Sequence, residues 1–379
     1  MTAKSMRVLF WSETFWPRVG GVENLAAKLL PALQHRGYEF IVVSWGTPDL
    51  PREQLYEGIP VYRFPFFSGL AAGNLDPLME TSAHVAKLKR DFGPDLVHIN
   101  SYGRSVLFHL ITANTHPAPM LLTLHQALPN EPVGRETLLG KILQTVDWVT
   151  ACSAAVLDHT GELVRDIIPR SSLIYNALEV PTFDPQPISF DPPRLLCLGR
   201  LVPEKGFDLA LTAFTTILDR FPGARLVMAG DGPERERLQQ QMIHLGLVNS
   251  VEFVGRVPPE TVAHLIDEST LVVIPSRLEG FGLVALEAAL MARPVVATHV
   301  GGLPEVVVHE QTGFLVESEN SHALAEAIAL LLNNPATAKK FGQAARSRAE
   351  EVFSWERHVS AYDALYRRLG NYERRVVST

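Results

Sequence analysis

Short apolar runs alternate with longer amphipathic segments along the whole chain. In the first half, the runs predict strands at residues 7–11, 40–44, 61–64, 96–100, 120–124, 148–151 and 173–175. Helical periodicity falls between most of them, for example over residues 22–35 and 77–91. Continuous apolar strands separated by helices are typical of parallel sheets covered on both faces, so the pattern predicts an α/β fold.

A proline-rich segment at residues 179–193 interrupts this alternation. It holds five prolines and little periodicity, which is typical of a linker between domains. Behind it, we expect strands at 195–198, 225–229, 251–254, 271–274 and 295–297, and helices at 323–332, 336–352 and 355–369. We therefore predict an N-terminal domain over residues 1–180, a linker over 181–193, a second domain over 194–353 and a closing helical segment over 354–379.

The composition adds limits on partners and compartment. The chain has 379 residues, of which 46% are hydrophobic, so it can bury ample core. Its net charge of −7 is spread without a long basic run, which argues against nucleic acid as the main partner. The two cysteines, Cys152 and Cys197, stand alone in apolar segments and give neither a disulfide framework nor zinc spacing.

Hydropathy predicts a protein without a membrane span. No stretch approaches the ~18–20 apolar residues of a spanning helix, and the apolar run after the N-terminus is too short for a signal peptide. The basic cluster of Lys87, Lys89 and Arg90 is interpreted as a solvated helix face. We expect a cytoplasmic protein, with a peripheral position at the inner membrane face left open for a lipid acceptor.

The strongest chemical signal follows the predicted strand at 271–274. A loop carrying Glu279 and two glycines leads directly into a helical pattern that begins at residue 283 and contains Glu287. This order of a strand, a turn with glycines and the N-terminus of a helix is typical of an anion-binding site, because the first backbone N–H groups of a helix have no partner within it. Both carboxylates flank that site and can face one ligand as hydrogen-bond acceptors.

A second anion-binding element follows the predicted strand at 195–198. There Arg200 and Lys205 lie in a glycine-bounded loop that precedes another helical pattern. Arginine supplies a planar fork of donors and lysine a compact charge, and together they can neutralise a diphosphate.

In these motifs the chain resembles the family 4 glycosyltransferases, which are retaining enzymes with the GT-B fold. The matching segments are residues 199–206, 230–233, 255–257, 279–287 and 301–305, and the two glutamates have the family's Glu-x7-Glu spacing. The resemblance implies two Rossmann-like domains whose parallel sheets face a central cleft, with the last helix returning to the first domain. It also implies a nucleotide-diphosphate sugar donor on the second domain and a hydroxyl acceptor (polysaccharide, glycolipid or small metabolite) on the first.

The resemblance assigns roles to the second domain's residues. Glu279 is expected at hydroxyls of the transferred sugar and Glu287 at the nucleotide ribose. The base is expected at the turn of Arg256 and Val257. The donor phosphates are expected near the backbone N–H groups of Phe281, Gly282 and Leu283, as a helix N-terminus favours.

In the first domain, the loop with Gly20 and Gly21 matches the family's glycine loop near donor phosphate and acceptor. It is not a dinucleotide fingerprint, because Gly-x-Gly-x-x-Gly is absent. His125 stands at the carboxyl end of a predicted strand, where open sheets bind ligands, and the resemblance places it near the sugar. His98 and Asn100 are supporting or acceptor-side candidates.

The expected reaction needs no metal and no cofactor. Asp-x-Asp, phosphate-loop and Gly-x-Ser-x-Gly motifs are absent from the sequence. Because no carboxylate nucleophile is evident, retention favours front-side attack, with a donor phosphate oxygen accepting the acceptor's proton. Arg200 and Lys205 would stabilise the charge that grows on the leaving diphosphate, and Glu279 and His125 would orient the sugar.

Three alternatives stay open at this point. A nucleotide-sugar epimerase of the same fold would convert its substrate without an acceptor. A glycan phosphorylase would need pyridoxal phosphate on a lysine. A non-catalytic nucleotide-sugar binder would show no turnover. The base and sugar of the donor are not determined by the sequence.

Overall fold

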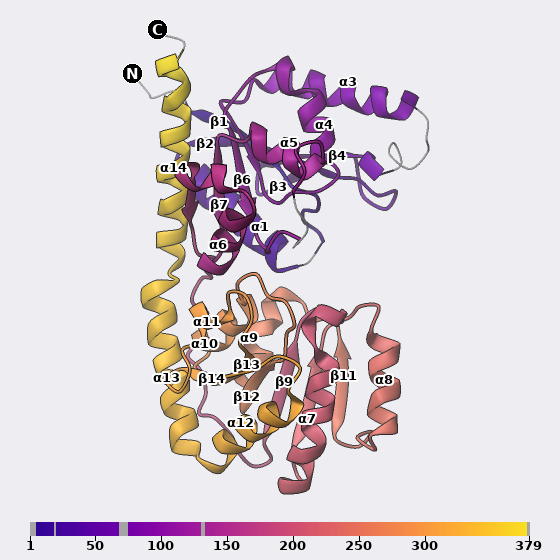
Figure 1. The fold of residues 1–379 in the computed structure, drawn as a ribbon, viewed down its shortest axis with the longest axis vertical. Coiled ribbons are helices and arrows are strands. Elements are labelled where there is room, and N and C mark those ends of the chain that lie inside the picture. The colour runs from indigo at the N-terminus through magenta and orange to yellow at the C-terminus, as the bar shows by residue number, and fades with distance from the viewer. Residues whose placement is uncertain (1–4, 19, 68–74, 130–132, 377–379) are drawn as a thin grey trace. The chain divides into compact units, whose positions relative to one another are not determined.

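The computed structural model describes residues 5–18, 20–67, 75–129 and 133–376. The chain divides into two compact units, Met1–Tyr175 together with Glu356–Thr379, and Asn176–Trp355. Each unit contains one sheet built mainly of parallel strands and covered by helices (Figure 1). The predicted α/β class with two parallel-strand sheets is therefore confirmed.

The first unit holds an 8-stranded sheet in the order β3-β4-β2-β1-β5-β6-β7-β8. All neighbours are parallel except β3 and β4. The strands are β1 (Met6–Trp11), β2 (Tyr38–Trp45), β3 (Glu53–Tyr56), β4 (Ile59–Phe64), β5 (Leu96–Ile99), β6 (Met120–Leu124), β7 (Trp148–Ala151) and β8 (Ser171–Leu173). Chain order reverses between β1 and β5, so the carboxyl ends of these two strands flank the switch point of the sheet.

Helices connect the strands of the first unit. They are α1 (Gly21–Gln34), α3 (Leu75–Phe92), α4 (Val106–Ile111), α5 (Leu138–Thr145) and α6 (Ala154–Leu163), with short 3-10 turns η1 (Ala113–Thr115) and η2 (Arg165–Arg170). The central strand β1 buries Val8, Leu9, Phe10 and Trp11 completely. Burial of each such side chain contributes roughly 1.5–3 kcal/mol, which explains why the apolar runs of the sequence mark the strands so well.

Helix α14 (Trp355–Val376) packs on this sheet from Glu356 onward. Its Tyr366 hydroxyl lies 2.6 Å from Nδ1 of His98 on β5, and Nε2 of His98 lies 2.8 Å from the Thr123 hydroxyl on β6. His98 is fully buried, and burial together with nearby His125 lowers its pKa to about 3. Both ring nitrogens of His98 therefore contact the protein's own core, which agrees with the supporting role, one of the two roles that the sequence left open.

The interpretation of the basic cluster on α3 as a solvated helix face is wrong for one residue. Lys87 and Arg90 are exposed, but only 1% of Lys89 is exposed. Its ammonium donates to the carbonyl of His109 on α4 at 3.0 Å, and burial lowers its pKa to about 7. Lys89 thus joins α3 to α4 and does not belong to a solvated face.

The second unit holds a 6-stranded parallel sheet in the order β11-β10-β9-β12-β13-β14. Its strands are β9 (Arg194–Leu198), β10 (Arg225–Ala229), β11 (Val251–Gly255), β12 (Leu271–Ile274), β13 (Val295–Thr298) and β14 (Gly313–Val316). Its helices are α7 (Phe207–Arg220), α8 (Arg235–His244), α9 (Pro259–Asp267), α10 (Leu283–Leu290), α11 (Leu303–Val306), α12 (Ser321–Asn333) and α13 (Pro335–Val352), with the 3-10 turn η3 (Pro203–Lys205).

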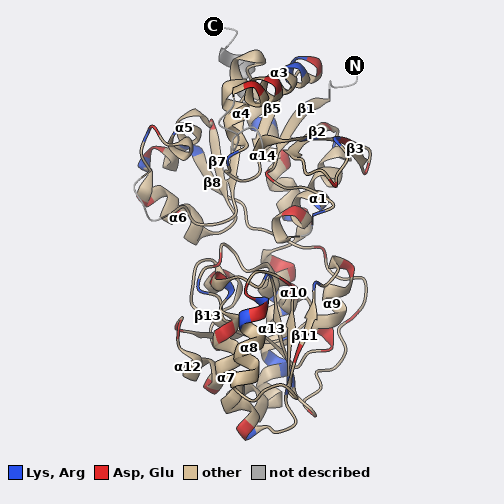
Figure 2. Ribbon diagram, turned by 90° about the vertical axis from the view of Figure 1, so that its right-hand side faces the viewer, with Lys and Arg blue, Asp and Glu red and all other residues tan. Residues whose placement is uncertain are grey.

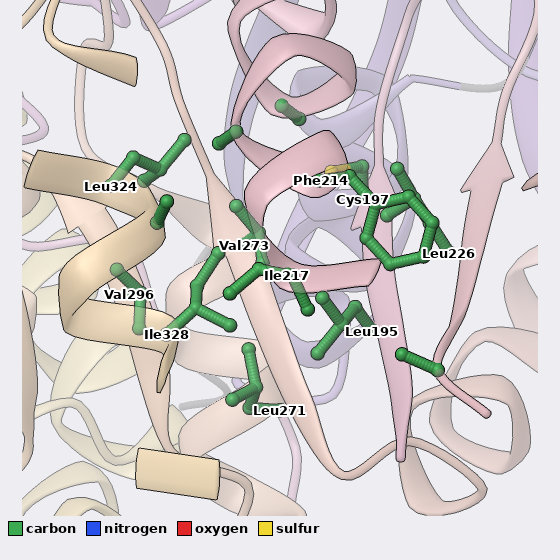
Figure 3. Close-up of a cluster of buried hydrophobic side chains, with 14 of the residues drawn as sticks. Leu195, Cys197, Phe214, Ile217, Leu226, Leu271, Val273, Val296, Leu324 and Ile328 are labelled. Carbon is green, nitrogen blue, oxygen red and sulfur yellow. The ribbon is translucent and has the colours of Figure 1, made fainter. Parts of the chain in front are cut away.

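One hydrophobic core of this unit lies between its strands and the helices α7 and α12 (Figure 3). Phe214 and Ile217 of α7 and Leu324 and Ile328 of α12 pack against strand residues that include Leu195, Cys197, Leu226, Leu271, Val273 and Val296. Cys197 is a buried core residue, as its apolar surroundings predict.

The proline-rich segment forms no helix or strand between residues 179 and 193, yet it is fixed to the second unit. Phe183 stacks on His264 with ring centroids 4.2 Å apart. The backbone N–H of Gln186 donates to Asp267 at 2.9 Å, and its carbonyl accepts from Arg293 at 2.9 Å. The proline-rich segment therefore belongs to the second unit. The boundary between the two units lies between residues 175 and 176.

Acidic and basic residues are interspersed over both units (Figure 2). Among the described residues, none of the helices combines the length and the apolar composition needed to cross a bilayer.

Candidate functional site

The switch point of the second sheet lies between β9 and β12. From there the chain order runs through β10 to β11 on one side and through β13 to β14 on the other. Doubly wound sheets bind ligands beyond the carboxyl ends of the strands at such a point. The loop after β9 carries Arg200 and Lys205, and the loop after β12 carries Glu279. The strand order thus brings the two predicted anion-binding elements together.

Lys205 and Glu279 form an ion pair at this point. The lysine Nζ lies 2.5 Å from Glu279 Oε2, and the hydroxyl of Ser276 donates to the same oxygen at 3.3 Å. The side chains are 28% and 14% exposed, so both are largely shielded but open on one side. Arg200 is exposed in the same loop, and its guanidinium forms no hydrogen bond or ion pair with the described residues.

Close backbone packing fixes these loops. Gly206 has φ +63°, and a Cβ there would lie 2.0 Å from the carbonyl oxygen of Pro275. Gly301, at φ +50°, would place a Cβ 1.7 Å from the carbonyl oxygen of Glu279. Such contacts exclude every side chain, so only glycine allows the loops after β9, β12 and β13 to approach this closely.

Arg277 is a positioning residue that sequence reasoning did not identify. Its guanidinium donates to both carboxylate oxygens of Asp208, at 2.8 and 2.9 Å, and to the carbonyl of Pro203 at 2.8 Å. Its backbone N–H donates to the carbonyl of Glu204 at 2.7 Å. Arg277 therefore joins the Glu279 loop to the turn that ends in Lys205.

Electrostatics agrees with this arrangement. Burial is the largest effect on the Asp208 carboxyl group and raises its pKa, but the hydrogen bonds and charge of Arg277, a backbone hydrogen bond and the charge of Arg237 together lower the pKa below its usual value. The same bonds, with those to Glu319, raise the pKa of Arg277 further above its usual range. An arginine in the loop after a strand and an aspartate in the first turn of a helix were both visible in the sequence. Their pairing depends on the order of the strands in the sheet, and the sequence does not show that order.

Helix α10 begins at Leu283, after Gly282, and contains only 8 residues. The first N–H groups of a helix have no acceptor within it, so they can meet an anion. The Phe281 side chain is buried and packs edge-on against Phe353 with centroids 5.4 Å apart. Only its main chain can therefore serve a ligand. Glu287 is half-buried on the second turn of α10.

Arg256 and Val257 follow β11, at the outer edge of the sheet. Two strand spacings separate β11 from β9, about 10 Å. Arg256 is exposed and Val257 is half-buried. This turn lies at the same carboxyl edge as Lys205, at a distance that a nucleotide could span.

In the first unit, Gly20 caps helix α1 and Gly21 is its first residue. The carboxylate of Glu23 folds back over this loop and accepts from the hydroxyl of Thr14. A Cβ at Gly20 would lie 2.2 Å from Glu23 Oε2. The negative charge that a helix N-terminus favours is thus supplied here by Glu23, which the sequence analysis did not predict.

His125 and Asn100 form a second pair in the first unit, beyond the carboxyl ends of β6 and β5. Nε2 of His125 donates to Oδ1 of Asn100 at 3.0 Å. Burial, with a smaller effect from His358, lowers the pKa of His125 to about 4, so the ring is neutral at pH 7. Within the described part of the chain, His125 Nδ1 and Asn100 Nδ2 are buried and have no hydrogen-bond partner.

The predicted site residues therefore fall into two groups. The first unit contains Gly20, Gly21, His98, Asn100 and His125, and the remaining predicted site residues lie in the second unit. In the described ranges, no three His, Cys, Asp or Glu side chains cluster so that they could hold a metal ion.

Comparisons with known proteins agree with this geometry. Residues 19–180 match the family described as Glycosyltransferase Family 4, and residues 182–348 match the one described as Glycosyl transferases group 1. The chain is 28% identical to glycogen synthase of Mycobacterium tuberculosis, over 95% of this chain and 94% of the relative.

Solved structures show the same fold. Sucrose-phosphate synthase from Thermosynechococcus elongatus superposes with a TM-score of 0.80 at 24% identity, covering 96% of this chain and 99% of that one. Anabaena HepE in complex with UDP and glucose gives a TM-score of 0.77 at 22% identity, covering 95% and 99%. These structures have the two-domain GT-B architecture. The chain therefore belongs to the family 4 glycosyltransferases and is a glycosyltransferase with the GT-B fold.

Proposed function

We propose that the protein is a retaining, metal-independent enzyme that moves a hexosyl group from a nucleotide-diphosphate sugar to an acceptor hydroxyl. The acceptor belongs to a polysaccharide, a glycolipid or a small metabolite. The observation that carries this proposal is the contact of Lys205 with Glu279 at the switch point between β9 and β12. The complex of HepE with UDP and glucose supports a nucleotide-sugar donor of this kind.

Lys205 can bind the leaving diphosphate while it keeps its contact with Glu279. An ammonium has three N–H donors, and the carboxylate takes one of them. The exposed guanidinium of Arg200 adds a second cation in the same loop. Negative charge on the diphosphate grows as the glycosidic bond breaks, and cations already held in place stabilise it without reorganisation.

Glu279 is suited to orient the transferred sugar. Its Oε2 accepts from Lys205 and Ser276, whereas no described residue donates to its Oε1. That oxygen is available to a sugar hydroxyl. Because Glu279 is already paired with a lysine, we assign it to binding, and we assign proton acceptance in front-side attack to a donor phosphate oxygen.

His125 and Asn100 are suited to bind one hydroxyl. The neutral ring presents Nδ1 as an acceptor, and Asn100 presents an N–H of Nδ2 as a donor. A hydroxyl can give its proton to the first and accept from the second. Buried polar atoms that lack partners cost stability, so a ligand that satisfies both gains affinity.

The test is a thermal-shift panel of nucleotide sugars followed by transfer assays with the best donor. The double variant Arg200→Ala, Lys205→Ala should lose at least about 100-fold in turnover, because each donor to a developing oxyanion is worth a factor of this order. The control is Lys339→Ala, Lys340→Ala, which removes two exposed cations from α13 of the same unit. Equal losses in both variants would contradict the proposal.

A further inference from the structure

A pocket of about 360 Å³ lies in the first unit, away from the residues discussed so far. It opens beyond the carboxyl ends of β2 and β4, and its lining includes Trp45, Thr47, Leu50, Arg52, Arg63 and Phe67. Trp45 and Phe67 meet edge to face, with ring centroids 4.6 Å apart. Together with Leu50 they make one wall apolar and aromatic, which suits a flat ring.

Arg63 places a buried positive charge in this pocket. It is only 3% exposed, and its guanidinium donates to the carbonyls of Pro51 at 3.1 Å and Trp16 at 2.7 Å. No Asp or Glu among the described residues forms an ion pair with it. Burial lowers its pKa, as it does for a cation without a counter-ion. A buried charge of this kind is stabilised by an anion that enters the pocket.

A second guanidinium group lines the pocket, and a third lies beside one of its lining residues. Arg18 lies over the ring of Trp45, 4.8 Å from its centroid, and Arg52 is exposed in the lining. The nearby carboxylate of Asp49 hydrogen-bonds to Thr47, and this bond, with the charge of Arg18, lowers its pKa. With these three arginines and one aspartate at or beside the pocket, the net charge there is positive.

The pocket shares an edge of the sheet with His125. Strands β2 and β6 are three spacings apart in the order β2-β1-β5-β6, which is about 14 Å. One small ring cannot reach from the pocket to His125, but the two ends of a larger molecule can.

We propose that this pocket binds the distal part of the acceptor, and that the acceptor carries a ring and an anionic group, phosphate or carboxylate. The inference rests on the proposed function in one respect, that His125 marks the end where transfer occurs. The ring lies against Trp45 and Phe67, and the anion faces Arg52 and Arg63.

Binding of small probes tests the pocket directly. Phenyl phosphate and benzoate represent the two anions, and phenyl β-glucoside is the neutral match. Isothermal titration compares the parent with Arg52→Glu and with Arg90→Glu, which makes the same charge change on the exposed face of α3. We expect at least one anionic probe to bind the parent and Arg90→Glu with equal affinity, and to bind Arg52→Glu at least tenfold more weakly. The parent should bind the neutral glucoside at least fivefold more weakly than it binds that anionic probe.

Equal binding by Arg52→Glu and Arg90→Glu, or equal binding of neutral and anionic probes, would overturn the inference. Thr47→Trp is a second variant, which should fill the pocket and abolish probe binding. Donor hydrolysis without acceptor is measured on all these proteins. If no nucleotide sugar binds or is hydrolysed by the parent, the proposed function fails; if hydrolysis persists and Arg52→Glu leaves probe binding unchanged, only the pocket assignment fails.

Discussion

The guanidinium of Arg277 holds the carboxylate of Asp208 through two parallel hydrogen bonds of 2.8 and 2.9 Å. One residue follows β12, and the other stands in the first turn of α7. The same guanidinium donates to the carbonyl of Pro203 in the turn that ends in Lys205, and the ammonium of Lys205 contacts Glu279. The geometry of the proposed anion site therefore depends on a pair that has no direct contact with that ammonium.

Arg277→Lys should lower turnover about tenfold while the charge is kept. A lysine cannot reproduce the fork that bonds both oxygens of Asp208 and the Pro203 carbonyl, so Lys205 is held less firmly. Loss of one charge-assisted bond costs roughly 1.5–3 kcal/mol. Steady-state kinetics of Arg277→Lys, Asp208→Asn and the double variant form a cycle in which the losses should not add. Additive losses would show that the pair does not act as a unit.

Glu279→Gln should reduce turnover about 100-fold, roughly 2.7 kcal/mol of transition-state stabilisation. The amide keeps the shape of the side chain but removes the charge that positions Lys205. Unfolding in urea should change by less than about 1 kcal/mol, since the pair is partly exposed. Glu260→Gln on the exposed side of α9 is the control. A parallel loss of stability and turnover would indicate a structural role for Glu279.

Lys89→Met should stabilise the protein, and more at pH 7 than at pH 9. The pKa of Lys89 is about 7 in the folded state and about 10.5 in an unfolded chain, so the unfolded chain binds more protons between these values. Stability of the parent therefore falls as pH falls from 10.5 to 7. Methionine removes this loss. Urea unfolding at both pH values measures the difference in the free energy of unfolding between variant and parent. The control is Lys87→Met, because Lys87 is an exposed residue paired with Asp91.

The parent should lose stability as pH falls from about 6.5 to about 4, and His125 should contribute one proton to this dependence. Its folded pKa is lowered to about 4 from 6.5, so in this window the unfolded chain is protonated and the folded unit is not. Each such histidine changes the slope by about 1.4 kcal/mol per pH unit. His125→Gln should therefore give a shallower slope, whereas His84→Gln, exposed on α3, should not.

The strands were predictable where burial dictated composition. Met120–Leu124, Trp148–Ala151, Arg225–Ala229 and Leu271–Ile274 match the apolar runs to the residue. Strand β3 was missed because Glu53–Tyr56 is an edge strand whose residues alternate between exposed and half-buried and contain no apolar run. Strand β8 lies at Ser171–Leu173, not at 173–175, because two serines pair there with β7 and the apolar residues follow.

The sequence indicated which loops carry the candidate site residues, but it did not indicate which of these residues contact one another. The sequence places Lys205 before one helix and Glu279 before another, 74 positions apart. Their contact follows from β9 and β12 being neighbours, which alternation alone does not specify. For the same reason, the sequence did not predict the pairing of Arg277 with Asp208 or the burial of Lys89 against α4.

The glycines at 206 and 301 have a consequence for how such an enzyme can change over generations. Because main chain touches main chain at both positions, a saturation library should tolerate no replacement at either of them. Position 200 is in solvent on the first of these loops, so the protein should fold with any side chain there, and under the proposed function a replacement should impair only catalysis. New donor preferences must therefore arise through surface side chains around an unchanged backbone path.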